Sequence, residues 1–185
     1  MASVSHRARR EAANRLERSV YGWDIRCREK GGSCVGKTRK GKGTKCMVLV
    51  DGKGLPLGVH VSAANQAESK LARATIEQAV VPRRHADRKP KRPKRIIADK
   101  AYDSRALWEL MRHLGIDLIV PHRRGRKRCY QDGRKLRRYR RRWIVERTIA
   151  WLFNFRRLFV RYERETRIFQ AFLQLACALI VLRRF

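Results

Sequence analysis

The stretch KRIIADKAYDSRALWELMRHLGIDLIV, residues 94–120, decides the fold class because it predicts a strand, a helix and a second strand in close succession. Arg95 to Asp99 is a short apolar run that predicts a strand. Ser104 is a typical N-cap for the helix that follows, and Gly115 ends that helix. Leu118 to Val120 predicts the next strand. Two strands joined in this way pair in parallel through a right-handed crossover.

The segments on either side of this unit complete the predicted sheet. Thr44 to Val50 and Leu55 to Val61 predict an antiparallel hairpin around an Asp-Gly turn. Ala67 to Val81 has apolar residues at helical spacing, and so do Tyr139 to Phe155 and Thr166 to Leu182. Together these segments predict an α/β fold in which a mixed sheet, an antiparallel hairpin plus a parallel β-α-β unit, is flanked by helices.

The N-terminal part of the chain gives weaker signals. Residues 1–30 predict no defined element, and Tyr21 to Arg26 is not a convincing strand. We therefore expect one folded domain over residues 31–185, preceded by a poorly defined segment. Gly31 to Thr38 formally matches a phosphate-binding G-x-x-x-x-G-K-[ST] loop, but a strand rather than a helix follows it, which argues against nucleotide binding.

The composition points to a polyanionic partner. Lys and Arg number 47 against 16 Asp and Glu, which gives a formal net charge of +31, while 43% hydrophobic residues argue against a wholly disordered basic chain. Five cysteines without a close pair fit neither a zinc ribbon nor a disulfide framework, so we expect free thiols. No segment resembles a signal peptide or a membrane span, and we expect a cytoplasmic protein.

Two acids stand out against this basic background. Asp99 lies at the carboxyl end of a predicted parallel strand, where open α/β sheets bind ligands. A capping role would also explain it, but Asp103 and Ser104 already stand where a cap is needed. Glu146 lies on the helix after the second basic loop, and an ordinary surface ion pair with Arg142 at i, i+4 would explain it if it stood alone.

The two acids matter as a pair because carboxylates converging from a strand end and a helix can hold Mg²⁺ or Mn²⁺ beside a substrate phosphate. Two such ions can activate the attacking oxygen and stabilise the leaving oxygen at phosphorus. That arrangement usually needs a third carboxylate. The sequence therefore indicates metal-dependent chemistry on nucleic acid, whereas a ribosomal or RNA-packaging role explains the charge but not the acids.

Four segments resemble the DDE-type transposases of bacterial insertion sequences. They are the Gly36–Lys45 segment, the Val50–Leu57 hairpin, the run Ile97-Ala98-Asp99-Lys100-Ala101-Tyr102-Asp103, and the helix with Tyr139, Arg142 and Glu146 in a Y-x-x-R-x-x-x-E pattern. The likeness covers roughly Gly31 to Phe185. It implies an RNase H-like catalytic fold, three carboxylates that bind two Mg²⁺ or Mn²⁺ ions, DNA nicking at element ends, and strand transfer by the freed 3′-hydroxyl.

The resemblance implies that Asp99 and Glu146 are catalytic metal ligands, and it leaves the first acid open. The family carries that acid on the first strand, where Asp24 is the candidate. Asp51 is a weaker one, because an Asp-Gly turn explains it. The family's basic residue seven positions after the Glu is Phe153 here, so Arg156 or Arg157 would have to substitute.

The expected partner is double-stranded DNA, both the element ends and the target, bound by a homo-oligomer. A chain from an upstream reading frame is a further candidate partner. The alternative is a truncated, catalytically inactive transposase that only binds DNA. The two basic loops, Arg83 to Arg95 and Arg123 to Arg142, are the predicted phosphate contacts. The individual candidates are Lys100, Arg123, Arg124, Arg126, Lys127, Arg128, Arg137, Arg138, Tyr139 and Arg142.

Overall fold

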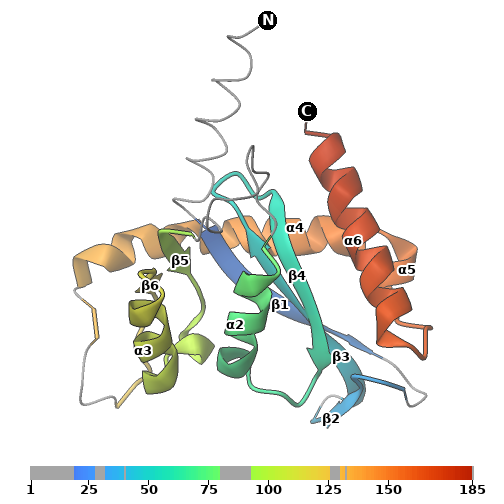
Figure 1. The fold of residues 1–185 in the computed structure, drawn as a ribbon, viewed down its shortest axis with the longest axis horizontal. Helices are drawn as coiled ribbons and strands as arrows, with labels where there is room; N and C mark the ends of the chain where they lie inside the picture. The colour runs from blue at the N-terminus through green and yellow to red at the C-terminus, as the bar shows by residue number, and fades with distance from the viewer. Residues whose placement is uncertain are drawn as a thin grey trace, which may run out of the picture.

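The computed structural model of the chain describes residues 19–27, 32–39, 41–79, 93–125, 130, 131 and 133–184. Within residues 19–27 it describes the backbone and the side chain of Val20. Figure 1 shows a central sheet with helices packed around it. Among the described residues, no helix is both long enough and apolar enough to cross a membrane.

The sheet contains six strands in the described part of the chain. In chain order they are β1 (Ser19–Cys27), β2 (Gly36–Thr38), β3 (Gly41–Val50), β4 (Pro56–Ala63), β5 (Arg95–Ile97) and β6 (Asp117–Ile119). β3 pairs antiparallel with β1, β2 and β4, whereas β1, β5 and β6 run parallel to one another. The expected hairpin and the parallel β-α-β unit are both confirmed, and the fold is the mixed α/β sheet flanked by helices that the sequence predicts.

Helices cover both faces of this sheet. They are α2 (Glu68–Glu77), α3 (Arg105–His113), α4 (Trp143–Phe153), α5 (Arg156–Phe159) and α6 (Thr166–Leu182), together with the 3₁₀ helices η1 (Lys100–Tyr102) and η2 (Gly133–Arg142). As Figure 1 shows, α4 runs across the strands and α6 lies beside β4, with which it is in contact. The bounds of α6 are those expected from the sequence.

Strand alternation divides the core into two halves. Val48 and Val50 of β3 pack with α4 and α6, whereas Met47 and Leu49 of the same strand pack with α2 and α3. All four side chains are fully buried. Successive residues of a strand point to opposite faces, so a strand buried on both faces reads as a continuous apolar run, as Cys46 to Val50 does.

β1 corrects the sequence analysis, which found no convincing strand over Tyr21 to Arg26. These residues lie in a nine-residue strand that pairs with β3 from Val20↔Val50 to Cys27↔Gly43. Gly22 and two charged residues, Asp24 and Arg26, interrupt the apolar pattern of this segment, so the strand is specified by its long-range partners rather than by its own composition.

A second correction concerns the basic segment before α4. The sequence predicted a loop up to about residue 138 and a helix from Tyr139, but residues 133–142 form the 3₁₀ helix η2, and the α-helix begins at Trp143. No side chain of η2 is buried, and seven of its ten residues are Lys or Arg. Such a composition provides no apolar face that could anchor an α-helix.

One buried charge ties the C-terminal helices to the sheet. Arg161, between α5 and α6, is only 1% exposed. Its Nη1 donates to Thr44 Oγ1 of β3 at 2.5 Å, and its Nε and Nη2 donate to the carbonyl oxygens of Glu163 and Arg164, each at 3.0 Å. Its guanidinium also lies over the Phe169 ring, 5.5 Å from the centroid. These bonds satisfy a charge that would otherwise be costly to bury.

Candidate active site

Asp99 lies just beyond β5, at the carboxyl end of the parallel strands. Ala98 N donates to the carbonyl of Ile119 on β6 at 3.1 Å, so the strand pairing continues up to the residue before the acid. Asp99 then caps η1, because its Oδ1 accepts from Lys100 N at 2.7 Å. The helix after it is capped by Ser104, whose Oγ accepts from Leu107 N at 3.3 Å. Asp99 is therefore a half-buried acid with a fixed backbone.

Tyr139 connects this acid to the helix that carries Glu146. The Tyr139 hydroxyl donates to Asp99 Oδ1 at 3.2 Å, across 40 residues of sequence. The Arg142 guanidinium lies 5.9 Å from the centroid of the Tyr139 ring and donates a short hydrogen bond to Glu146 Oε1. Asp99, Tyr139, Arg142 and Glu146 therefore form one connected group of side chains.

The protonation of Tyr139 reflects these surroundings. Partial burial raises the pKa of its hydroxyl, and the negative charges of Asp99 and Glu146 raise it further, while Arg142 opposes them. A raised pKa keeps the phenol protonated and able to donate to Asp99 across the physiological range. The hydroxyl can thus hold the Asp99 carboxylate in one orientation while the phenol itself stays neutral.

Each carboxylate keeps one oxygen available. Within the described part of the chain, the hydrogen bonds of Asp99 use Oδ1 and the ion pair of Glu146 uses Oε1, which leaves Asp99 Oδ2 and Glu146 Oε2 without a partner. Hard divalent cations prefer such carboxylate oxygens. The donor set therefore fits a magnesium or manganese ion, with one ligand contributed by a strand end and the other by a helix.

The candidate for the third acid lies on the neighbouring strand. Asp24 is in β1, opposite Cys46 of β3, and β1 pairs in parallel with β5 through Val20↔Ile97. Asp24 therefore lies four residues after Val20, and Asp99 lies two residues after Ile97, the residue that pairs with Val20. The structure does not describe the Asp24 side chain. The side chains that it does describe include no group of three or more His, Cys, Asp or Glu that could hold a metal ion.

Asp51, the weaker candidate, has a structural role. Its Oδ1 accepts from Lys53 N and Leu55 N, each at 2.8 Å, and the side chain is fully buried in the turn between β3 and β4. The turn interpretation made from the sequence accounts for these contacts.

Close packing places α4 against the sheet. A Cβ atom on Gly22 of β1 would lie 2.9 Å from Val145 Cγ1 and 3.3 Å from Ile149 Cδ1. At the β3–β4 turn, Thr148 Oγ1 donates to the carbonyl of Gly54 at 2.7 Å, and Gly54 adopts φ +91°. Sequence analysis did not single out these positions, although a glycine inside a strand often marks a close approach of this kind.

Of the predicted phosphate contacts, Tyr139 and Arg142 bind the two acids, and the others fall into three groups. Lys100, Arg124, Arg137 and Arg138 are exposed, and their side chains make no hydrogen bond or ion pair within the described residues. Arg123 instead donates to the carbonyl of Ala101 at 2.8 Å and to that of Lys100 at 3.3 Å, so it supports the loop that follows Asp99. Arg126, Lys127 and Arg128, and most of the loop from Arg83 to Arg95, lie outside the described residues.

Cation–aromatic contacts run along one side of α4. Trp143, Arg147 and Trp151 follow one another at four-residue spacing, and the Arg147 guanidinium lies 4.7 Å from the ring centroid of each tryptophan. The i, i+4 spacing of a cation and two indoles is the signal that could have identified this stack.

Comparisons with known proteins identify the family of the chain. A sequence model of the family described as "Transposase DDE domain" matches residues 18–181, and thus begins earlier than the expected Gly31 and includes β1. The chain is 34% identical over 182 residues to the transposase assigned to insertion sequence element IS402 in Burkholderia cepacia, covering 96% of this chain and 82% of that protein.

Two solved structures show weaker similarity. One is the piggyBac transposase synaptic complex with hairpin DNA, with a TM-score of 0.37 and 11% identity over 60% of this chain and 24% of that one. The other is the intasome of simian T-cell lymphotropic virus with the PP2A regulatory subunit B56 gamma, with a TM-score of 0.43 and 17% identity over 85% of this chain and 46% of that one. By the extent of the family match and its insertion-sequence relative, the chain belongs to the Transposase DDE domain family.

Proposed function

We propose that the protein cuts DNA at the ends of an insertion sequence and joins the freed 3′ ends to target DNA, in a reaction that depends on Mg²⁺ or Mn²⁺. The observation that carries this proposal is the connected group formed by Asp99, Tyr139, Arg142 and Glu146. Family membership supports the reaction class. A protein that only binds DNA would need no strand-end acid linked to a second acid on a helix.

Asp99 and Glu146 would hold the metal through the oxygens that have no partner among the described residues, and Asp24 is the proposed third ligand. When bound, two such ions supply an activated attacking oxygen and stabilise the leaving oxygen at phosphorus. Tyr139 orients Asp99 through the 3.2 Å hydrogen bond, and Arg142 orients Glu146. Positioning groups of this kind fix the geometry of metal ligands.

The exposed basic residues would bind the phosphates of the DNA around the site. Lys100 follows Asp99 directly, and Arg137 and Arg138 project from η2, the helix that carries Tyr139. Phosphate contacts fix the register of a protein on DNA without reading its sequence. The proposed partners are duplex DNA and a second copy of the chain assembled on it, with a chain from an upstream reading frame as a further candidate.

The test is a nicking and strand-transfer assay on a supercoiled plasmid that carries the element ends, with Mg²⁺ or Mn²⁺. Asp99→Ala, Glu146→Ala and Asp24→Ala should each abolish both products, because each removes a proposed ligand. The matched control is Glu109→Gln on α3, an exposed acid whose Oε1 pairs with Arg105 Nε at 2.7 Å. It should leave both products unchanged.

The alternative function, DNA binding without catalysis, gives a different result in the same assay. The parent protein would then bind the plasmid tightly and in a salt-sensitive way but yield no metal-dependent product. Loss of DNA binding in Asp99→Ala would also contradict the proposal, because removing a negative charge should leave affinity for a polyanion intact or increase it.

A further inference from the structure

A buried acid ends the short helix that follows Asp99. Asp103 is the C-terminal cap of η1 and is only 1% exposed. Its Oδ1 accepts from Trp108 Nε1 on α3 at 3.0 Å, and its Oδ2 accepts from the backbone N of Arg123 at 3.0 Å. These bonds satisfy the buried carboxylate within the protein. Asp103 therefore has the surroundings of a structural anchor, whereas Asp99 keeps one carboxylate oxygen for a metal ion.

Arg123 connects this anchor to the carbonyl groups of η1. It lies four residues after the end of β6, and its Nε and Nη2 donate to the carbonyl oxygens of Lys100 at 3.3 Å and Ala101 at 2.8 Å. The Lys100 carbonyl also accepts from Asp103 N at 3.1 Å. Arg123, Asp103 and the Lys100 carbonyl thus form a closed ring of hydrogen bonds. Because the last carbonyls of a helix have no partner within the helix, an arginine that binds them fixes its end.

This ring of hydrogen bonds reaches Asp99 through the first amide of η1. Asp99 Oδ1 accepts from Lys100 N at 2.7 Å, which is shorter than its 3.2 Å bond from the Tyr139 hydroxyl. The Lys100 amide and the Lys100 carbonyl belong to one residue, and Arg123 holds the carbonyl. A shift of η1 would therefore move the donor and turn the Asp99 carboxylate with it.

We propose that Asp103 and Arg123 are positioning residues for Asp99: they fix η1, and η1 fixes the carboxylate that binds the metal ion. This inference rests on the proposed function, because it takes Asp99 as a metal ligand. Groups that orient the ligands of a metal ion typically change its affinity by about 10- to 100-fold when they are removed. The inference also changes the role of Arg123 from a phosphate contact to a contact within the protein, since two of its guanidinium nitrogens already bind carbonyl groups.

The next residue in the chain offers a matched comparison. Arg124 is exposed, and its side chain makes no hydrogen bond or ion pair within the described residues. Arg123→Gln should weaken the binding of Mn²⁺ to the DNA-free protein by about 10-fold or more, measured from the electron paramagnetic resonance signal of free Mn²⁺. Arg124→Gln should leave this affinity unchanged. In DNA binding, only Arg124→Gln should reduce the slope of log K against log salt, by about 0.9.

Two further variants test the two parts of the ring. Asp103→Asn keeps the shape of the side chain but places an amide donor opposite Arg123 N, and Arg123→Lys keeps only one donor group for the two carbonyls. Both should weaken Mn²⁺ binding, and Arg123→Lys should do so less than Arg123→Gln. In the nicking assay each should raise the Mn²⁺ concentration that gives half the maximal rate, while the rate at saturating Mn²⁺ recovers. A general folding defect would lower the rate at saturation as well.

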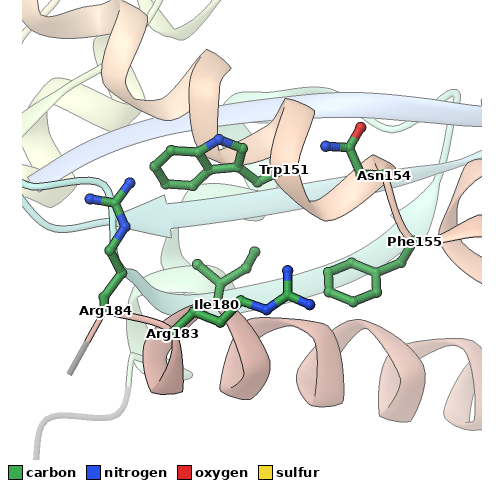
Figure 2. Close-up of a pocket in the computed structure, with 6 residues that line it drawn as sticks. All are labelled: Trp151, Asn154, Phe155, Ile180, Arg183 and Arg184. Carbon is green, nitrogen blue, oxygen red and sulfur yellow. The ribbon is translucent and has the colours of Figure 1, made fainter.

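Hydrogen exchange gives a measurement that needs neither metal nor DNA. Tyr102 N donates to the Asp99 carbonyl at 2.9 Å, and Asp103 N donates to that of Lys100. In Arg123→Gln both amides should exchange about 10-fold faster, the effect of losing roughly one hydrogen bond, while those of α3 should not change. The control is Arg184→Gln. As Figure 2 shows, Arg184 lies beside Trp151 of α4, 4.4 Å from its ring centroid, so its removal should change neither the exchange of η1 nor Mn²⁺ affinity.

The outcomes separate this inference from the proposed function. Mn²⁺ affinity or η1 exchange equal to that of the parent in Arg123→Gln would overturn the positioning role, and a salt slope reduced as in Arg124→Gln would make Arg123 a phosphate contact instead. A parent that binds Mn²⁺ in an Arg123-dependent way but never nicks DNA would support the positioning role and contradict the proposed function. Nicking with an Mn²⁺ affinity that does not depend on Arg123 would do the reverse, and a parent that binds no Mn²⁺ would contradict both.

Discussion

Tyr139 has the contacts of a positioning residue. It contacts neither of the two free carboxylate oxygens, but its hydroxyl binds the other oxygen of Asp99, and the Arg142 guanidinium lies near its ring. A phenol is suited to this role because its raised pKa keeps the proton on the tyrosine. The sequence indicated Tyr139 through the family resemblance, but its contact with Asp99 depends on how η2 returns to the sheet.

Tyr139→Phe should lower the rate of metal-dependent nicking by about 10- to 100-fold, the usual effect of losing a group that orients a metal ligand. The ring and its packing remain, so stability should change little. The rate should recover in part at higher Mn²⁺ concentration, because the defect lies in metal binding. Tyr162→Phe on the exposed loop before α6 is the control, and an equal loss there would contradict the role assigned to Tyr139.

At the scale of elements, the contact between α4 and β1 sets the position of Glu146. β5 ends at Ile97, two residues before Asp99. α4 packs on β1, where Gly22 leaves room for the Val145 side chain. Any side chain at Gly22 would separate the helix from the strand unless its neighbours shifted. The position of Glu146 therefore depends on a residue with no side chain on a different element.

Gly22→Ala should lower the free energy of unfolding by about 1–3 kcal/mol, the usual effect of overpacking a core contact, and should also reduce nicking. Urea unfolding followed by circular dichroism measures the first effect, and the plasmid assay measures the second. Gly133→Ala provides the matched control, since nothing lies within 4 Å of a Cβ placed there. Similar losses in both variants would mean that the contact with Val145 is not the cause.

The link between α5 and α6 depends on the buried guanidinium of Arg161. Lysine cannot supply the hydrogen bonds that Arg161 donates to Thr44 Oγ1 and to the carbonyls of Glu163 and Arg164. Arg161→Lys should therefore cost on the order of 3 kcal/mol of unfolding free energy, because buried acceptors lose their donors. Arg167→Lys, at an exposed position of α6, should stay within roughly 0.5 kcal/mol of the parent in the same urea titration.

For the whole molecule, the sequence predicted the parts with local signals and missed those set by distant partners. The hairpin, the β-α-β unit and α6 each have their own turn, cap or periodicity. β1 has none of these, because Gly22 and charged residues break its pattern and its order in the sheet comes from pairing with β3 and β5. For the same reason Asp99 was predictable as a strand-end acid, whereas its hydrogen bond with Tyr139 was not.

The net charge of +31 also acts at the scale of the whole molecule. DNA affinity should fall by about 10³-fold or more between 50 and 200 mM salt, as expected when six to ten phosphates are contacted. A double variant Arg137→Ala with Arg138→Ala should reduce the slope of log K against log salt by about 2, or 0.9 per lost contact.

The matched control for that slope is Arg73→Ala. Arg73 lies on α2, in the other helix layer, and pairs with Glu77 at 2.8 Å. Its removal should leave the salt slope unchanged. An equal decrease in slope would mean that DNA is bound by the diffuse charge of the protein and not by η2.

The ten-residue 3₁₀ segment η2 has a further consequence for the free protein. Runs of 3₁₀ helix beyond three or four residues are uncommon because their hydrogen bonds are poorly aligned, and in η2 seven like charges repel one another. Its amide protons should therefore exchange rapidly with deuterium in the absence of DNA and much more slowly when phosphates neutralise the arginines, while those of the buried part of α4 should change little. The nucleic acid would then act as a folding partner for the segment that holds Tyr139, so that the catalytic arrangement is fully ordered only on its substrate.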